Sequence, residues 1–196
     1  IVVANKSPMN ESTMKDAKQV KMICQLSTGY DNVDIEYCKN RGIHVANARN
    51  YSTAAVAQHT VALALSVLEN LPYYDNYVKS GAYASQPRFA HFKPWYELEG
   101  KTWGIAGMGN IGRRVAKAAE ALGCKVIFFA TSGHSDCRDY ERVDWDTLLA
   151  QSDILSLHCP LSDRTFHLMN ADAFSKMKKS AVLINVARGA VVDTDA

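Results

Sequence analysis

Three glycines with the spacing Gly-x-Gly-x-x-Gly, namely Gly107, Gly109 and Gly112, form a pattern that binds phosphate groups when a strand precedes it and a helix follows it. Both conditions are predicted here, by an apolar strand at residues 102–106 and an amphipathic helix at residues 110–122. Gly107 permits the tight turn, Gly109 lets the backbone approach a pyrophosphate, and Gly112 lets the helix pack against the strand. The pattern therefore predicts a dinucleotide-binding loop.

The start of the predicted helix supports this interpretation. The amide groups near Asn110 and Ile111 would point at the phosphates, and the positive end of the helix would favour the negative charge. The strand–loop–helix–strand unit over residues 102–130 has 29 residues, close to the ~30 of a dinucleotide-binding unit. The alternative is a glycine-rich turn that binds no ligand, and this context argues against it.

The end of the second strand, residues 125–129, decides which dinucleotide is expected. A carboxylate there would hold the ribose 2′-hydroxyl of NAD, but the strand ends in Ala130, Thr131 and Ser132. Ala130 removes the repulsion that an Asp would exert on the 2′-phosphate of NADP. The side chains of Thr131, Ser132 and His134 can donate to a phosphate or to a hydroxyl. The sequence therefore allows NAD and NADP and predicts weak discrimination between them.

Arg188 is the candidate residue for binding a substrate and acting on it. It follows a predicted strand, residues 181–186, at the carboxyl edge where α/β folds place their ligands. Its planar guanidinium has enough donors to bind a carboxylate and still reach a carbonyl oxygen. The amides of Thr28 and Gly29 can hold a carboxylate as well. A surface arginine and an ordinary strand-to-helix turn are the alternatives, and the residue type alone favours the surface reading for Arg188.

Strand-like and helix-like segments alternate along the chain, which predicts a parallel sheet covered by helices. The first third has a β-α-β-α-β pattern whose first helix begins at Ser7-Pro8. A long helix follows from Ser52, a second helix covers residues 73–79, and residues 81–100 have no period. The remaining strands and helices are expected at residues 102–106, 110–122, 125–130, 146–151, 154–158, 171–177 and 181–186. This order predicts an α/β fold with a Rossmann-type doubly wound sheet.

Composition excludes several classes of protein. The chain has 196 residues, 47% hydrophobic and 21% charged, which is typical of folded domains and not of disordered chains. Lys and Arg outnumber Asp and Glu by only 22 to 20, so no nucleic-acid partner is predicted. The most apolar stretch, residues 60–68, is shorter than the ~20 residues of a membrane span, and no signal peptide is visible. Five scattered cysteines predict free thiols, no metal site and a cytoplasmic protein.

Several motifs, in the same order along the chain, resemble those of one known family. They are the substrate loop (residues 27–34), the start of the interdomain helix (47–59), the phosphate loop (107–112), a third nucleotide-contacting segment (158–161 with Thr165) and the segment with an essential arginine (185–189). On these motifs the chain resembles the D-isomer-specific 2-hydroxyacid dehydrogenases over nearly its whole length. Within that family, Tyr51-Ser52-Thr53 and Val56-Ala57-Gln58 are most similar to glycerate dehydrogenases, also called hydroxypyruvate reductases.

The resemblance implies two domains. Both chain ends would build a flavodoxin-like substrate domain, and an NAD(P)-binding Rossmann domain would be inserted between them. Residues 1–50 are then part of the substrate domain, and residues 51–196 form the NAD(P)-binding domain, incomplete at its C-terminal end. Because Ile1 stands in a strand already under way and Ala196 just after a helix start, we expect a chain truncated at both ends. A homodimer is implied as well.

The resemblance also implies a reaction, which is hydride transfer between NAD(P)H and a small 2-oxo or 2-hydroxy acid such as hydroxypyruvate and glycerate, or glyoxylate and glycolate. Arg188 would be catalytic, with Thr28 and Gly29 binding the substrate. Lys6 would lie near the substrate, although a solvated lysine is equally expected there. NAD is the implied cofactor, with NADP as an alternative. Beyond the phosphate loop and Ala130, Thr131 and Ser132, the implied cofactor contacts are Val56, His158, Cys159, Pro160, Thr165, Val186, Ala187 and Arg188.

The proton donor of this reaction is missing from the sequence. The family places a histidine paired with a glutamate downstream of the arginine, but the eight residues after Arg188 include neither. His59 is expected to pack or to cap, and His158 to line the cofactor site. The other histidines read as surface residues: His44, His91, His134 and His167. We therefore expect the full protein to be longer, and these 196 residues to be inactive alone.

Two other functions remain open from the sequence. A non-catalytic NAD(H)-sensing scaffold of the same fold would bind partner peptides and would need an exposed apolar groove. A formate dehydrogenase of the same superfamily would keep the cofactor but change the substrate, and it resembles this chain less around residues 51–59.

Overall fold

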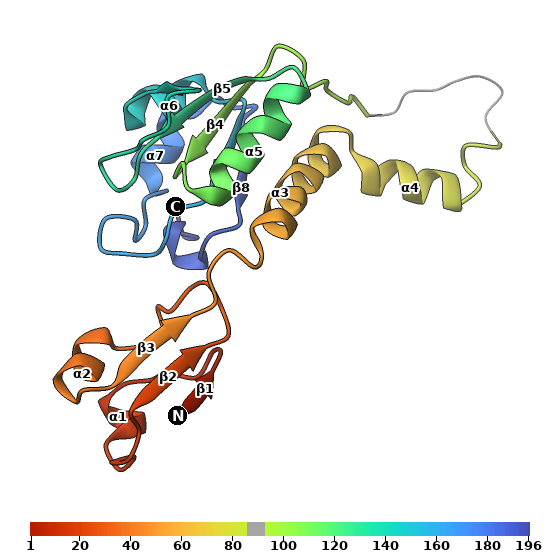
Figure 1. Cartoon of the computed structure of the whole chain (residues 1–196). Coiled ribbons are helices and arrows are strands. Elements are labelled where there is room, and N and C mark those ends of the chain that lie inside the picture. The colour runs from red at the N-terminus through yellow and green to blue at the C-terminus, as the bar shows by residue number, and fades with distance from the viewer. Residues whose placement is uncertain (86–92) are drawn as a thin grey trace. The chain divides into compact units, whose positions relative to one another are not determined.

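The computed structural model describes residues 1–85 and 93–196. His91 and part of the segment that was expected to be irregular, residues 81–100, lie outside the described residues. The chain forms two compact units, Ile1–Ser52 and Thr53–Ala196 (Figure 1). Each unit has hydrophobic core clusters of its own. The units are therefore described one at a time.

The Ile1–Ser52 unit is a small parallel sheet with two short helices. Its strands pair in the order β1-β2-β3, and all pairs are parallel. The elements are β1 (Val2–Ala4), α1 (Glu11–Met14), β2 (Met22–Gln25), α2 (Ile35–Asn40) and β3 (His44–Asn47). Its core includes Ile23, which is fully buried, together with Met14 and Cys38.

Side-chain caps decide where the two short helices begin. Ser7-Pro8 was expected to open the first helix, and this prediction is wrong. The helix begins at Glu11 because the Asn10 side chain accepts a hydrogen bond from the Thr13 amide at 3.2 Å, which completes a capping box. α2 begins after Asp34, whose carboxylate accepts from the Tyr37 amide at 2.9 Å.

The Thr53–Ala196 unit is a doubly wound α/β domain. Its described part has five strands, which are all parallel and lie in the order β6-β5-β4-β7-β8. The strands are β4 (Thr102–Ala106), β5 (Lys125–Phe129), β6 (Glu141–Arg142), β7 (Ile154–Leu157) and β8 (Val182–Asn185). The helices are α3 (Thr53–Leu68), α4 (Leu71–Lys79), α5 (Asn110–Ala121), α6 (Trp145–Gln151), α7 (Ala171–Lys176) and the 3-10 turn η1 (Gly189–Val191). The predicted α/β class and doubly wound sheet are confirmed.

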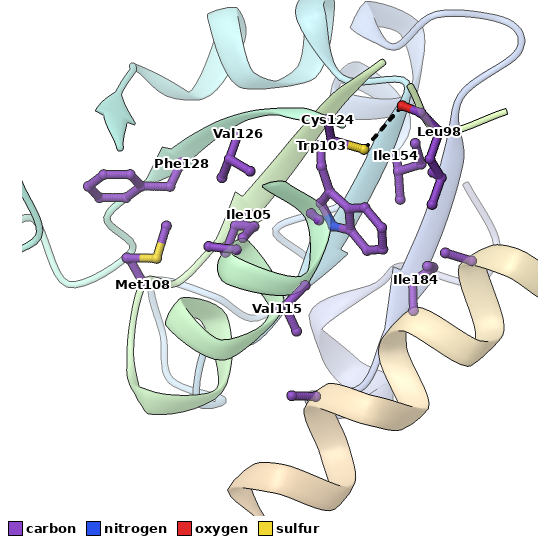
Figure 2. Close-up of a cluster of buried hydrophobic side chains, with 14 of the residues drawn as sticks. Leu98, Trp103, Ile105, Met108, Val115, Cys124, Val126, Phe128, Ile154 and Ile184 are labelled. Atoms are coloured by element: carbon purple, nitrogen blue, oxygen red, sulfur yellow. Dashed lines mark hydrogen bonds between the residues drawn. The ribbon is translucent and has the colours of Figure 1, made fainter. Parts of the chain in front are cut away.

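Helices cover both faces of this sheet. The first core cluster joins α3 and α5 to one face, where Trp103 and Ile105 of β4 lie against Val115 of α5, and Ile184 lies toward α3 (Figure 2). The second cluster joins α6 and α7 to the other face and includes Leu148. Two buried faces explain why β7 is apolar at nearly every position and does not alternate.

Helix length among the described residues bears on membrane insertion. No single described helix is long and apolar enough to cross a membrane. Only α3 and α4 together, with a bend of 64° between them, meet that test of length and composition. All five cysteines are free thiols.

Candidate functional site

The loop between β4 and α5 requires glycine at two positions. Gly107 has a φ of +98°, which L side chains rarely adopt, and a Cβ there would lie 3.0 Å from the backbone nitrogen of Cys159. A Cβ at Gly112 would lie 2.3 Å from the carbonyl oxygen of Gly107. The first turn of α5 therefore packs directly on the loop, and the loop packs directly on the segment after β7.

Gly109 differs from these two because nothing in the described chain requires glycine there. Its φ of −82° and ψ of −162° suit any residue, and a Cβ would meet no atom within 4 Å. It is the exposed N-cap residue of α5, and no described side chain forms a cap hydrogen bond with this helix. The positive end of α5 therefore faces open space beside Gly109, where an anion can approach the backbone.

A pocket of about 260 Å³ lies at the carboxyl ends of three neighbouring strands, β5, β4 and β7. It brings together eight of the residues expected to bind a cofactor: Gly107, Gly109, Ala130, Thr131, Ser132, His158, Cys159 and Pro160. Met108, His134, Ser135 and Asp136 complete its lining. This is the edge of a doubly wound sheet at which α/β proteins bind their ligands.

His158 follows β7 and is held in place by a chain of hydrogen bonds. The Trp103 indole donates from Nε1 to the Ser156 hydroxyl at 2.9 Å, and that hydroxyl bonds to Nε2 of His158 at 3.0 Å. The other ring nitrogen, Nδ1, is buried and has no partner among the described residues. Burial lowers the pKa of His158 to about 4, so the ring is neutral at pH 7.

The pocket contains a carboxylate, although the residues directly after β5, Ala130, Thr131 and Ser132, include none. The chain turns after Ala130, where the Gly133 amide donates to the Ala130 carbonyl at 2.9 Å and φ of Gly133 is +85°. After this turn, Asp136 lines the pocket and forms an ion pair with Arg113 of α5. Neither Asp136 nor Arg113 was predicted to belong to the site. The signal in the sequence that could have indicated this turn is Gly133.

Thr165 braces the segment after β7 and is not one of the residues that line the pocket. Its side chain is buried, and its hydroxyl donates to the Pro160 carbonyl at 2.6 Å and accepts from the Ser162 amide at 2.9 Å. Its contribution to a cofactor site would be to shape the Pro160 loop.

Arg188 lies just after β8, whose Asn185 pairs in register with Leu157 of β7. The carboxyl end of β8 is therefore next to the strand end that bears His158. The Asn185 side chain donates to the Arg188 carbonyl at 2.8 Å and accepts from the Ala187 amide at 3.0 Å, which shapes the turn. The Arg188 guanidinium is half-buried and donates to the Ala187 carbonyl at 3.0 Å.

The remaining predicted contacts of this unit lie close to the loop or in the core. Asn110 and Gly112 stand in the first turn of α5, while Ile111 and Val186 pack against the first core cluster. Val56 is half-buried in α3, and its carbonyl accepts from the Thr60 hydroxyl at 2.8 Å. These residues are not among those that line the pocket.

The predicted substrate residues lie in the Ile1–Ser52 unit, where side chains hold the loop after β2. The Asn47 side chain donates to the Thr28 carbonyl at 2.7 Å, and the Thr28 hydroxyl donates to the Ala48 carbonyl at 3.0 Å. The Ser27 hydroxyl donates to the Gly29 carbonyl at 2.6 Å. These bonds use the carbonyls of Thr28 and Gly29 and the hydroxyls of Ser27 and Thr28, and do not involve the amides of Thr28 and Gly29. Lys6 is exposed on the loop after β1.

Comparison with known proteins agrees with this geometry. Residues 61–196 match the family model described as D-isomer specific 2-hydroxyacid dehydrogenase, NAD binding domain. The chain is 40% identical over 194 residues to the glycerate dehydrogenase of Methylorubrum extorquens, an alignment that covers 98% of this chain and 60% of that protein.

Solved structures give the same picture. The chain is similar to D-lactate dehydrogenase from Aquifex aeolicus complexed with NAD and lactic acid, with a TM-score of 0.88 and 34% identity, covering 98% of this chain and 58% of that one. It is also similar to an acyclic imino acid reductase in complex with NADPH and D-Arg, with a TM-score of 0.90 and 30% identity, covering 98% and 61%. The chain spans about 60% of the length of these relatives.

Proposed function

Because this chain belongs to the D-isomer-specific 2-hydroxyacid dehydrogenase family, we propose that its pocket binds a nicotinamide dinucleotide and that the whole protein reduces a small 2-oxo acid. Hydroxypyruvate and glyoxylate are the candidate substrates, since curated relatives include a glycerate dehydrogenase, a hydroxypyruvate reductase and glyoxylate reductases. These names favour the dehydrogenase over a nucleotide-sensing scaffold or a formate dehydrogenase.

The residues of the pocket fit such a cofactor. The open space beside Gly109, at a position where nothing in the described chain requires glycine, is the observation that carries the proposal. A pyrophosphate at this position would approach the backbone without meeting a Cβ. The partnerless Nδ1 of His158 points the same way, because a buried ring nitrogen is costly unless some group supplies a hydrogen bond.

When bound, a nicotinamide cofactor would supply the hydride, and the chain's own residues bind and orient the acid. The guanidinium of Arg188 pairs with the substrate carboxylate and polarises its carbonyl, because its planar fork has donors for both. In the Ile1–Ser52 unit, the amides of Thr28 and Gly29 supply a further anion-binding element. Lys6, on the loop after β1, supplies a positive charge. His158 is not the proton donor, because it is neutral and its Nε2 bonds to Ser156.

Turnover by the whole protein tests the proposal. We expect oxidation of NADH or NADPH, followed at 340 nm, with hydroxypyruvate or glyoxylate as the acceptor. Arg188→Gln should lower kcat/KM by a hundredfold or more, because it removes the charge that binds and polarises the substrate. Arg114→Gln, which makes the same change at an exposed position of α5, is the matched control and should retain activity. Full activity of Arg188→Gln would contradict the assigned role.

The homodimer and the cytoplasmic location belong to the same proposal. The dimer rests on the family resemblance, and the location is supported by five cysteines that are all free thiols. Sedimentation equilibrium of the whole protein would test the dimer directly, and a monomer at micromolar concentration would contradict it.

A further inference from the structure

We infer that the ion pair between Arg113 and Asp136 makes this pocket select a dinucleotide with a free ribose 2′-hydroxyl over one with a 2′-phosphate. The inference rests on the proposed cofactor site and deepens it. It also differs from the expectation of weak discrimination, which depended on the missing carboxylate at the end of β5.

The first step is the position of the carboxylate. Ala130 follows β5, is buried and has no polar side-chain atom. The turn at Gly133 is held from both sides, by the Ala130 carbonyl at 2.9 Å and by Nη2 of Arg142, which donates to the Gly133 carbonyl at 2.7 Å. Asp136 is therefore returned to the pocket by a braced turn, beside Thr131 and the end of β5.

The second step is the state of Arg113. Its backbone amide donates to the Gly109 carbonyl at 2.9 Å, which places it in the first turn of α5 beside the phosphate loop. Its side chain is only 32% exposed, and the guanidinium pairs with Oδ1 of Asp136. The Asp136 side chain is 91% exposed, so its carboxylate remains open to solvent and to a ligand.

The third step is the charge that a ligand would meet. Among the described residues that line the pocket, Asp136 is the only carboxylate. A ribose hydroxyl can donate a hydrogen bond to it, which is the role of the acidic residue in NAD-binding folds. A 2′-phosphate brings a charge of about −2 toward that carboxylate and has to compete with it for Arg113. The pair therefore favours the hydroxyl form and penalises the phosphate form.

Two other polar side chains near this end of the pocket already donate to backbone carbonyls. The Ser132 hydroxyl donates to the His134 carbonyl at 2.8 Å, and the Arg142 guanidinium is held by the Gly133 carbonyl. Thr131 contributes a neutral hydroxyl, which can form a hydrogen bond with a ribose 2′-hydroxyl or with a 2′-phosphate. Selectivity is thus assigned to one carboxylate and the arginine that it holds.

Binding of two cofactor fragments to the whole protein tests this assignment without turnover. ADP-ribose and its 2′-phosphate are titrated by calorimetry into the native protein, Asp136→Asn, Arg113→Gln and the matched control Asp139→Asn. We expect the native protein and the control to bind ADP-ribose at least tenfold more tightly than its 2′-phosphate. Asp136→Asn should shrink this ratio tenfold or more, because it removes the repulsion and releases Arg113. Arg113→Gln should weaken binding of the 2′-phosphate further.

Two failures are distinguishable in this experiment. Equal or tighter binding of the 2′-phosphate by the native protein would overturn the selectivity while leaving the cofactor site in place. The same holds if Asp136→Asn keeps the native ratio while circular dichroism shows it folded. Absence of binding by either fragment to the native protein would overturn the cofactor site itself, and the selectivity with it.

Discussion

At the residue scale, His158 shows how burial decides the protonation state of a side chain in the pocket. Its pKa is lowered to about 4 because a charged ring would lose its hydration there. The hydrogen bond between Nε2 and Ser156 keeps the ring oriented, and Trp103 donates to the same hydroxyl from the sheet core. The His158 ring is therefore neutral and held in one orientation near pH 7, and it has no positive charge with which to bind a phosphate.

The pKa of His158 predicts a loss of stability in acid. The unfolded chain binds a proton at this ring below its ordinary pKa of about 6.5, whereas the folded chain does so only near 4. The free energy of unfolding should therefore fall as the pH drops from 6.5 toward 4, by about 2 kcal/mol between pH 7 and pH 5 from this residue. Urea unfolding at both pH values measures the difference.

Two variants assign this pH dependence to His158. His158→Asn should be less stable at pH 7, but its stability should fall less than the native protein's between pH 7 and pH 5. His44→Gln changes an exposed histidine of β3 and should keep the native slope. An identical slope in His158→Asn and the native protein would contradict the assignment.

At the element scale, the loop at the N-terminus of α5 has two glycines that the fold requires and a third that the fold does not require. Gly107 and Gly112 are constrained by atoms of the chain itself, since a Cβ at either position would press on backbone. Gly109 carries no such constraint. Stability and cofactor binding should therefore respond differently to substitutions within one loop.

Gly109→Asp makes this difference measurable. Asp is a favoured N-cap residue and the backbone at Gly109 is already extended, so the free energy of unfolding should stay the same or rise by a few tenths of a kcal/mol. The added carboxylate would occupy the position of the pyrophosphate, so binding of ADP-ribose should weaken a hundredfold or more. Calorimetry and urea unfolding of the same sample measure both. Gly112→Ala should affect stability more than binding, with a loss of about 1–3 kcal/mol in the free energy of unfolding.

Elements with a strong pattern were predictable from the sequence, and those that depend on tertiary contacts were not. β7 and β5 were expected within one residue of their observed ends, because apolar runs bounded by turns indicate buried strands. β6 was missed, since Glu141 and Arg142 are an exposed edge pair with no periodicity. The start of α1 was misplaced because Asn10, and not Ser7, makes the capping contacts.

The same division applies to the site. The phosphate loop was predictable because its glycines are adjacent in sequence and stand between a strand and a helix. The pairing of Asp136 with Arg113 was not, because it joins a turn after β5 to a helix that begins after β4. A carboxylate that lies beyond a turn has no fixed number of residues between it and the glycine motif. The rule that places an acidic residue at the end of the second strand therefore does not identify Asp136.

At the scale of the whole molecule, the pocket is built entirely within one of the two units. All of its lining residues fall between Gly107 and Pro160, inside Thr53–Ala196. The described core of the Ile1–Ser52 unit is formed by its own residues, such as Ile23 and Met14. Cofactor binding and the stability of the smaller unit should therefore be separable in a single experiment.

Hydrogen exchange of the whole protein with and without ADP-ribose tests this separation. At a ligand concentration of about 100 times Kd, the larger unit should gain roughly 2.7 kcal/mol against opening events that abolish the pocket. Amides of β4, the first turn of α5 and the segment after β7 should exchange more slowly, because they surround the pocket. Amides of β2 and β3 in the smaller unit should keep their rates, since their hydrogen bonds and core are their own. Equal protection of β2 and β5 would contradict independent units and would show that the ligand couples them.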